Sequence, residues 1–238
     1  GGLDDWRNEF GLWEETWKKP PEHSAKQVWL EVVKRHCPEV EDFNRAWGTD
    51  FASFAELAAS TVPRKAATAA ARAMAEEYTR LAAEAYFSVL TSAIRRYDPN
   101  HLILGCRFAG WAPGIWDIAG KYCDVVSFND YPRVDVDRGV PRELVEKYQE
   151  FYEQAQAPLW ITEWSFPAMD SGLPNKHGAG MRVATQTQRA RCYRFFQNTL
   201  FALPFMVGSN YFMYIDQPAL GISATFPEDS NYGLVDVT

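Results

Sequence analysis

A glutamate at the end of a short apolar run is the residue best suited to chemistry in this sequence. Residues 158–166 read Pro-Leu-Trp-Ile-Thr-Glu-Trp-Ser-Phe. A run of this kind, bounded by proline and turn residues, is typical of a buried parallel strand whose last residue emerges at the carboxyl end. Catalytic groups of α/β proteins gather at that end, so Glu163 is a candidate catalyst. A strand-end glutamate that caps a helix or pairs with an arginine explains the pattern equally well.

Three other strand-like runs also end in polar or aromatic side chains. They cover residues 101–108, 123–131 and 207–216. The carboxyl ends of neighbouring parallel strands lie at one edge, so polar residues at the same point of successive repeats indicate one shared pocket. A single polar strand end is usually structural, whereas four in succession favour a site. The side chains at these ends are Arg107, Asn129, Tyr131, Glu163, Trp164, Asp216 and Gln217.

The residue types of this expected pocket favour carboxylate chemistry on a neutral polar substrate. The four histidines have neither HxH nor HExxH spacing, and the four cysteines form no CxxC pair, so we expect neither a metal nor a cofactor. The four cysteines are interpreted as buried free thiols. They are Cys37, Cys106, Cys123 and Cys192.

Composition limits the class of partner. The net charge of −7 provides no basic field that would attract nucleic acid or an anionic membrane. No apolar run approaches the roughly 20 residues of a membrane span. The 238 residues are 47% hydrophobic and 15% aromatic, which is enough for a sizeable core and suits a cleft that stacks on flat ligand faces.

The elements that must position these residues alternate between strand and helix. Strands separated by helices pair in parallel through right-handed crossovers, so the predicted fold class is α/β. Before residue 100 the pattern is helical, and its longest helix is expected at 65–97. The other expected helices are 24–33, 40–47, 51–57, 115–121, 141–156 and 185–203.

Several motifs together resemble the β-agarase-type glycoside hydrolases. They are Asn8-Glu9, Asn-Arg-Ala-Trp-Gly-Thr-Asp-Phe at 44–51, the runs 96–101 and 104–108, Asp-Val-Val-Ser-Phe-Asn at 124–129, and Trp-Ile-Thr-Glu-Trp at 160–164. These enzymes belong to the clan of retaining (β/α)8-barrel glycosidases that also includes β-galactosidases. The resemblance implies that Glu9 is the general acid/base, that Asn8 contacts the sugar 2-hydroxyl, and that Glu163 is the nucleophile.

The resemblance also implies a domain organisation. Residues 1–238 become a partial (β/α) barrel of the TIM type, in which 1–63 hold the end of strand four plus a helical insertion and 64–238 hold βα units five to eight. A complete barrel takes about 250 residues. We therefore expect the barrel to be completed by a missing N-terminal segment or by another chain, and favour the segment. An extracellular or periplasmic location is also implied.

Further positions are expected to contact sugar. Trp164, Phe166 and Tyr211 are candidates for stacking on sugar faces, although core packing is favoured for Phe166. The candidates for binding sugar hydroxyls are Asn129, His177, Asp216 and Gln217. A solvated loop histidine explains His177 at least as well.

Three functions remain open at this point. The first is a retaining endo- or exo-glycosidase that acts on a galactose-containing polysaccharide such as agarose. The second is a β-galactosidase or another glycosidase of the clan. The third is a catalytically inactive carbohydrate-binding remnant.

Overall fold

The computed structural model describes residues 11–112 and 114–235. The chain divides into two compact units, residues 1–90 and residues 91–238, and each is described by itself. Among the described residues, none of the helices combines the length and the apolar character that crossing a membrane requires.

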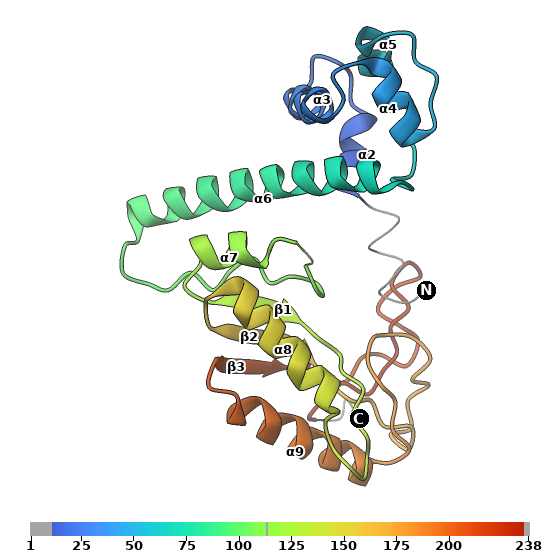
Figure 1. Cartoon of the computed structure of the whole chain (residues 1–238). Coiled ribbons are helices and arrows are strands. Elements are labelled where there is room, and N and C mark those ends of the chain that lie inside the picture. Colours follow the sequence, from blue (N-terminus) through green and yellow to red (C-terminus); the bar gives the residue numbers. More distant parts are fainter. Residues whose placement is uncertain (1–10, 113, 236–238) are drawn as a thin grey trace. The chain divides into compact units, whose positions relative to one another are not determined.

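The first unit is helical (Figure 1). Its helix α4 coincides with the predicted 40–47, and Gly48 ends it in the left-handed conformation with φ 65°, whereas α5 begins three residues after the predicted start at 51. Helix α6 begins at Ala69, and its last residues belong to the second unit. Helix α2 was not predicted. The bounds are α2 Leu12–Trp17, α3 Ser24–His36, α4 Val40–Trp47, α5 Phe54–Ala59 and α6 Ala69–Tyr97.

An aromatic cluster forms the core of this unit. Trp17 and Trp29 are fully buried, and the ring centroids of Trp13 and Trp47 lie 4.9 Å apart. Lys26 is also fully buried, and its ammonium donates to the backbone carbonyls of Trp17 at 2.5 Å and Ser60 at 2.8 Å. Burial lowers the pKa of Lys26 to about 8, so the side chain remains charged at neutral pH. The ammonium therefore binds carbonyls at the carboxyl ends of the two short helices α2 and α5.

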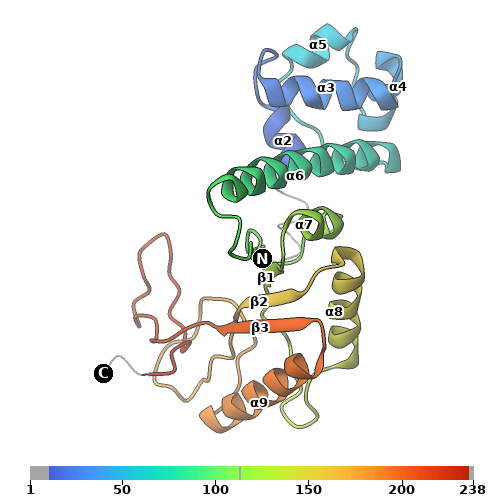
Figure 2. The ribbon, with the colours of Figure 1, turned by 90° about the vertical axis from the view of Figure 1, so that its left-hand side faces the viewer.

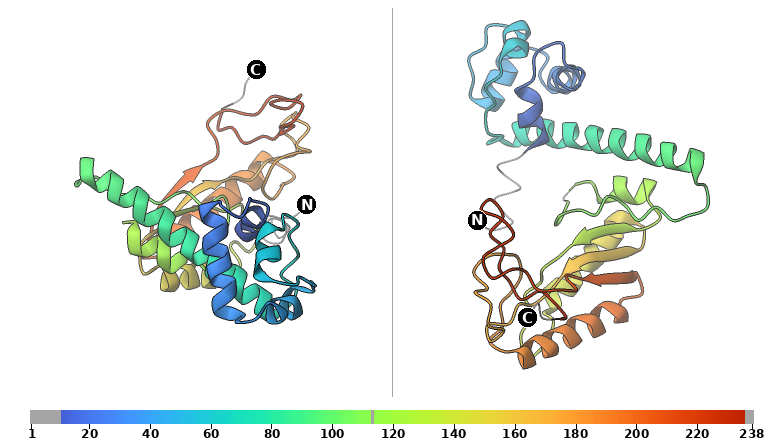
Figure 3. Two further views of the ribbon diagram at one scale, coloured as in Figure 1. Left: turned by 90° about the horizontal axis from the view of Figure 1, so that it is seen from above. Right: turned by 180° about the vertical axis from the view of Figure 1, so that it is seen from behind.

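The second unit contains a parallel sheet in the order β1-β2-β3. Figure 2 shows strands β2 and β3 side by side, with helices α8 and α9 nearby, and Figure 3 gives two further views. The alternation of strand and helix predicted from the sequence is confirmed, as is the parallel pairing. The strands are β1 Val126–Asn129, β2 Leu159–Trp164 and β3 Met206–Tyr211, and the helices are α7 Trp116–Tyr122, α8 Arg142–Ala155 and α9 Gln186–Ala202.

The two faces of the sheet differ in character. Phe128 of β1 contacts Tyr148 of α8 with ring centroids 6.0 Å apart, and Trp164 of β2 contacts Phe196 of α9 at 4.9 Å. These apolar side chains bury one face under the helices. The register shifts after Phe128, so that Asn129 lies opposite Glu163. This register shift changes the direction of both polar side chains, which lie at the carboxyl end of the sheet.

Residues 101–108 do not form the predicted strand. Their strand-type pairing with the sheet is limited to one parallel bridge between Phe108 and Phe128. Gly105 and Arg107 have φ values of 84° and 53°, and a left-handed residue cannot continue a strand. The same segment leaves Cys106 exposed, which corrects its interpretation as a buried thiol.

Candidate active site

Glu163 lies at the carboxyl end of β2, and both of its carboxylate oxygens have partners. The Tyr131 hydroxyl donates to Oε2 at 3.0 Å. The guanidinium of Arg107 forms an ion pair with Oε1. The Glu163 side chain is 16% exposed, so it remains accessible to a ligand. Two donors on a largely buried carboxylate stabilise its ionised form.

The unusual backbone of Arg107 directs its side chain toward this cluster. Its own N–H donates to the Ser127 hydroxyl at 3.1 Å, which fixes the left-handed residue against β1. Its Nε donates to Oδ1 of Asn129 at 3.2 Å. The guanidinium therefore bridges the ends of β1 and β2. A non-glycine residue in this region is costly, and such residues concentrate at functional sites.

Asn129 and Thr162 complete the polar surface between the two strands. Oδ1 of Asn129 accepts from the Thr162 hydroxyl at 2.9 Å as well as from Arg107. These contacts hold the amide in one orientation beside Glu163. The structure thus brings together Arg107, Asn129, Tyr131 and Glu163, as the strand-end argument predicted.

Tyr131 is a partly buried hydrogen-bond donor. Burial raises the pKa of Tyr131 well above its usual range, and the neighbouring Tyr232 and Glu228 raise it further. The phenol therefore stays protonated through the alkaline range. Gly180 lies against the ring, since a Cβ at this position would be 3.2 Å from Cδ1 of Tyr131. The loop that contains His177 consequently passes beside Tyr131.

Two of the expected substrate contacts are wrong. Trp164 is 0% exposed and packs among Tyr193, Phe196 and Tyr211, so neither face of its ring is open to a sugar. Gln217 is buried, where its amide donates to Glu228 at 2.5 Å and accepts from the N–H of Ser230 at 3.1 Å. Strand alternation turns Trp164 to the helix face, and Gln217 orders the C-terminal segment.

Asp216 and His177 are also engaged by this C-terminal segment. Asp216 is buried and accepts from Asn231 Nδ2 at 2.8 Å and from the N–H of Gly233 at 2.7 Å. His177 is half-exposed, and its Nδ1 lies 3.5 Å from Oδ2 of the buried Asp229. Their predicted contacts with sugar hydroxyls stay predictions.

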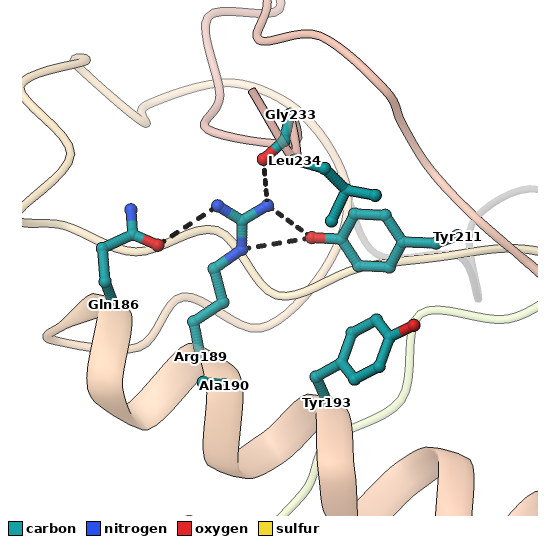
Figure 4. A pocket seen from close by; sticks show the side chains of 7 residues that line it. All are labelled: Gln186, Arg189, Ala190, Tyr193, Tyr211, Gly233 and Leu234. Atoms are coloured by element: carbon teal, nitrogen blue, oxygen red, sulfur yellow. Dashed lines mark hydrogen bonds between the residues drawn. The ribbon is translucent and has the colours of Figure 1, made fainter. Parts of the chain in front are cut away.

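Tyr211 lines a pocket of about 350 Å³ between α9 and the end of β3. Figure 4 shows its hydroxyl directed at Arg189, whose Nε donates to it at 3.1 Å. Arg189 also donates to the carbonyl of Gly233 at 2.6 Å. Glu163 does not line this pocket. Tyr211 as a sugar platform remains a prediction.

Sequence reasoning missed the residues that order the loops around the site. Arg189 binds the C-terminal segment, and the Asp229 carboxylate accepts from the N–H groups of Lys176 and His177, both at 2.8 Å. The Tyr232 hydroxyl donates to the carbonyl of Ala179 at 2.8 Å. The only sequence signal was the polar stretch Glu-Asp-Ser-Asn-Tyr-Gly at 228–233, which reads as a turn.

The two residues implied as acid/base and 2-hydroxyl ligand, Glu9 and Asn8, lie outside the described residues. Within the described ranges, the structure contains no cluster of three or more histidine, cysteine, aspartate or glutamate side chains that could hold a metal ion.

Comparison with known proteins identifies the family. A model of glycoside hydrolase family 42, described as β-galactosidase, matches residues 6–180. The chain belongs to this family. β-Agarase B and β-agarase A of Vibrio sp. (strain JT0107) are similar to it, with 33% identity over 223 residues and 32% over 218. The alignments cover 93% and 89% of this glycoside hydrolase chain but 22% and 20% of the agarases, so the chain spans about a fifth of their length.

Solved structures give the same result. An exo-β-agarase matches this family member with a TM-score of 0.75 and 30% identity, over 93% of this chain and 29% of that one. The crystal structure of another agarase matches with a TM-score of 0.73 and 31% identity, over 93% and 30% of the two chains. The resemblance to β-agarase-type glycoside hydrolases is confirmed.

Proposed function

We propose that this chain provides part of the active site of a retaining glycoside hydrolase that cleaves β-glycosidic bonds in a galactose-containing polysaccharide such as agarose. The observation that carries the proposal is Glu163, a largely buried carboxylate at a strand end with one donor on each oxygen. The agarase relatives support the substrate class.

In the proposed reaction Glu163 attacks the anomeric carbon while Glu9 donates a proton to the departing glycosidic oxygen. This forms a covalent glycosyl-enzyme and breaks the glycosidic bond. Glu9 then removes a proton from water, which attacks the same carbon and releases Glu163. A retaining mechanism requires the two carboxyl groups to lie about 5 Å apart. Arg107 and Tyr131 hold Glu163 ionised and oriented for attack.

We also propose that the three-stranded sheet belongs to a (β/α)8 barrel, as its second half. Among the described residues the outer edge of β3 has no strand partner, and β1 has the single bridge to Phe108 on its free side. An open parallel sheet with such edges is unusual in a stable enzyme, and closure removes both edges. A segment N-terminal to these residues, or another chain, would supply the remaining strands.

The test replaces Glu163 by glutamine in the full-length protein and measures release of reducing sugar from agarose. The variant should lose at least about a thousandfold in kcat, as expected when a covalent nucleophile is removed. Glu146→Gln is the matched control, because Glu146 lies on α8 and pairs with Arg142 at the surface. Wild-type turnover by Glu163→Gln would contradict the proposal.

A second candidate, a β-galactosidase, is favoured by the description of the matching family. A panel containing agarose, agaro-oligosaccharides and a chromogenic β-galactoside separates the two. Binding of these sugars without any turnover by the full-length protein would support the third function, an inactive carbohydrate-binding remnant.

A further inference from the structure

Asp130 is a buried acid that the proposed reaction does not use. The residue is 7% exposed and lies between Asn129 and Tyr131, both of which belong to the Glu163 cluster. Its own side chain has a different environment, since Oδ2 accepts a hydrogen bond from the Tyr148 hydroxyl of α8 at 2.6 Å. The backbone therefore presents its neighbours to the polar end of the sheet and Asp130 to the helix side.

Asp130 is bound on three sides. Tyr148 is fully buried and packs on Phe128, so its hydroxyl is held in place. The N–H of Asp130 donates to the carbonyl of Glu163 at 3.0 Å. The N–H of the adjacent Tyr131 favours the ionised form of the Asp130 carboxylate, which lowers its pKa. One residue thus connects α8 to the backbone of both the nucleophile and its hydroxyl donor.

Opposing effects act on the pKa of this carboxylate. Burial raises the pKa of Asp130 to about 6, against the opposing effects of the Tyr148 hydroxyl, the Lys147 ammonium and the N–H of Tyr131. Tyr148 and Lys147 face it from α8, and the N–H of Tyr131 faces it from the segment after β1. A proton bound near neutral pH weakens the acceptor to which these donors bind.

We propose that Asp130, held by Tyr148, is a positioning residue that places the Tyr131 hydroxyl against Glu163 for the glycosidase reaction. Its ionised form binds the N–H of Tyr131 most strongly, and protonation loosens this backbone. The proposal rests on the proposed role of Glu163. It requires no substrate contact by Asp130, which is separated from the cluster by its own backbone.

The test measures the pH dependence of kcat in the full-length protein. The wild type should lose activity below pH about 6 through one group that Asp130→Asn removes, because asparagine still accepts from Tyr148 but does not titrate in this range. At pH 7 the variant should turn over about tenfold more slowly, since an amide is a weaker acceptor, while KM stays within about twofold.

A second variant tests the proposal even if Asp130→Asn misfolds. Tyr148→Phe leaves Asp130 titratable but removes a donor that stabilises its ionised form, so the acidic limb should move to higher pH. Asp137→Asn is the control, because Asp137 is 76% exposed and pairs with Arg191. Its pH profile should match that of the wild type.

The outcomes separate this proposal from the proposed function. If Glu163→Gln is inactive but Asp130→Asn and Tyr148→Phe both keep the wild-type pH profile, the positioning role is wrong and the nucleophile stands. If Glu163→Gln retains full activity, the nucleophile assignment fails and the role of Asp130 fails with it. Loss of the acidic limb in Asp130→Asn together with its displacement in Tyr148→Phe supports the proposal.

Discussion

Removal of the Tyr131 hydroxyl should impair catalysis without unfolding the protein. Tyr131→Phe deletes the donor that lies 3.0 Å from Oε2 of Glu163 and keeps the ring. A hydrogen bond to a charged group contributes about 1.5–3 kcal/mol, and each 1.36 kcal/mol corresponds to about tenfold in rate. Because Glu163 is only 16% exposed, water replaces the donor poorly. We therefore expect kcat/KM on agarose to fall by about 10- to 150-fold.

The pH dependence sharpens this prediction. Since burial raises the pKa of Tyr131 above its usual range, the phenol remains a donor in alkaline solution and the deficit of Tyr131→Phe should be constant between about pH 6 and pH 10. Tyr214→Phe is the control, because Tyr214 is 73% exposed. A change of less than about threefold, or a deficit that disappears as the pH rises toward 10, would refute the reasoning.

Three further results are expected. Arg107→Met should lower kcat by about a hundredfold, because it removes the cation paired with Glu163, and steady-state kinetics on agarose will measure this. Lys26→Met should reduce the free energy of unfolding in urea by about 3 kcal/mol, since it leaves buried carbonyls without a donor, whereas the surface variant Lys18→Met should change it by less than about 1 kcal/mol. Burial raises the pKa of Asp130 to about 6, from about 3.9 in the unfolded chain, so ionisation of this group destabilises the folded state as the pH rises from about 4 to above 6. Over that interval the free energy of unfolding of Asp130→Asn should increase by up to about 3 kcal/mol relative to that of the wild type.

The parts of the fold that the sequence predicted are those with a strong local signal. The apolar run before Glu163 is bounded by Pro158, and β2 spans Leu159–Trp164. Helices α4 and α9 begin and end close to their predicted residues because caps and glycine mark them. The segment at 101–108 was mispredicted because the left-handed backbone of Arg107 is fixed by Ser127, a contact across the fold that no local pattern reveals.

The candidate site, like the fold, was predictable from the sequence only in part. Polar strand ends correctly brought together Arg107, Asn129 and Tyr131 around Glu163, because parallel strands place their carboxyl ends at one edge. Trp164 does not join them, because alternation after the register shift turns its ring under α9. Gln217 does not join them either, because residues 228–230 occupy its amide. Such side-chain partners depend on how two loops meet, which periodicity does not encode.

The central claim, that Glu163 is the nucleophile, is tested most directly by trapping the glycosyl-enzyme. The full-length protein would be incubated with a 2-deoxy-2-fluoro galactoside that carries an activated leaving group, digested, and analysed by tandem mass spectrometry. The account predicts one fluorosugar per molecule, esterified to Glu163 and absent from Glu163→Gln. A label attached to another residue, or turnover of agarose with inversion at the anomeric carbon, would contradict it.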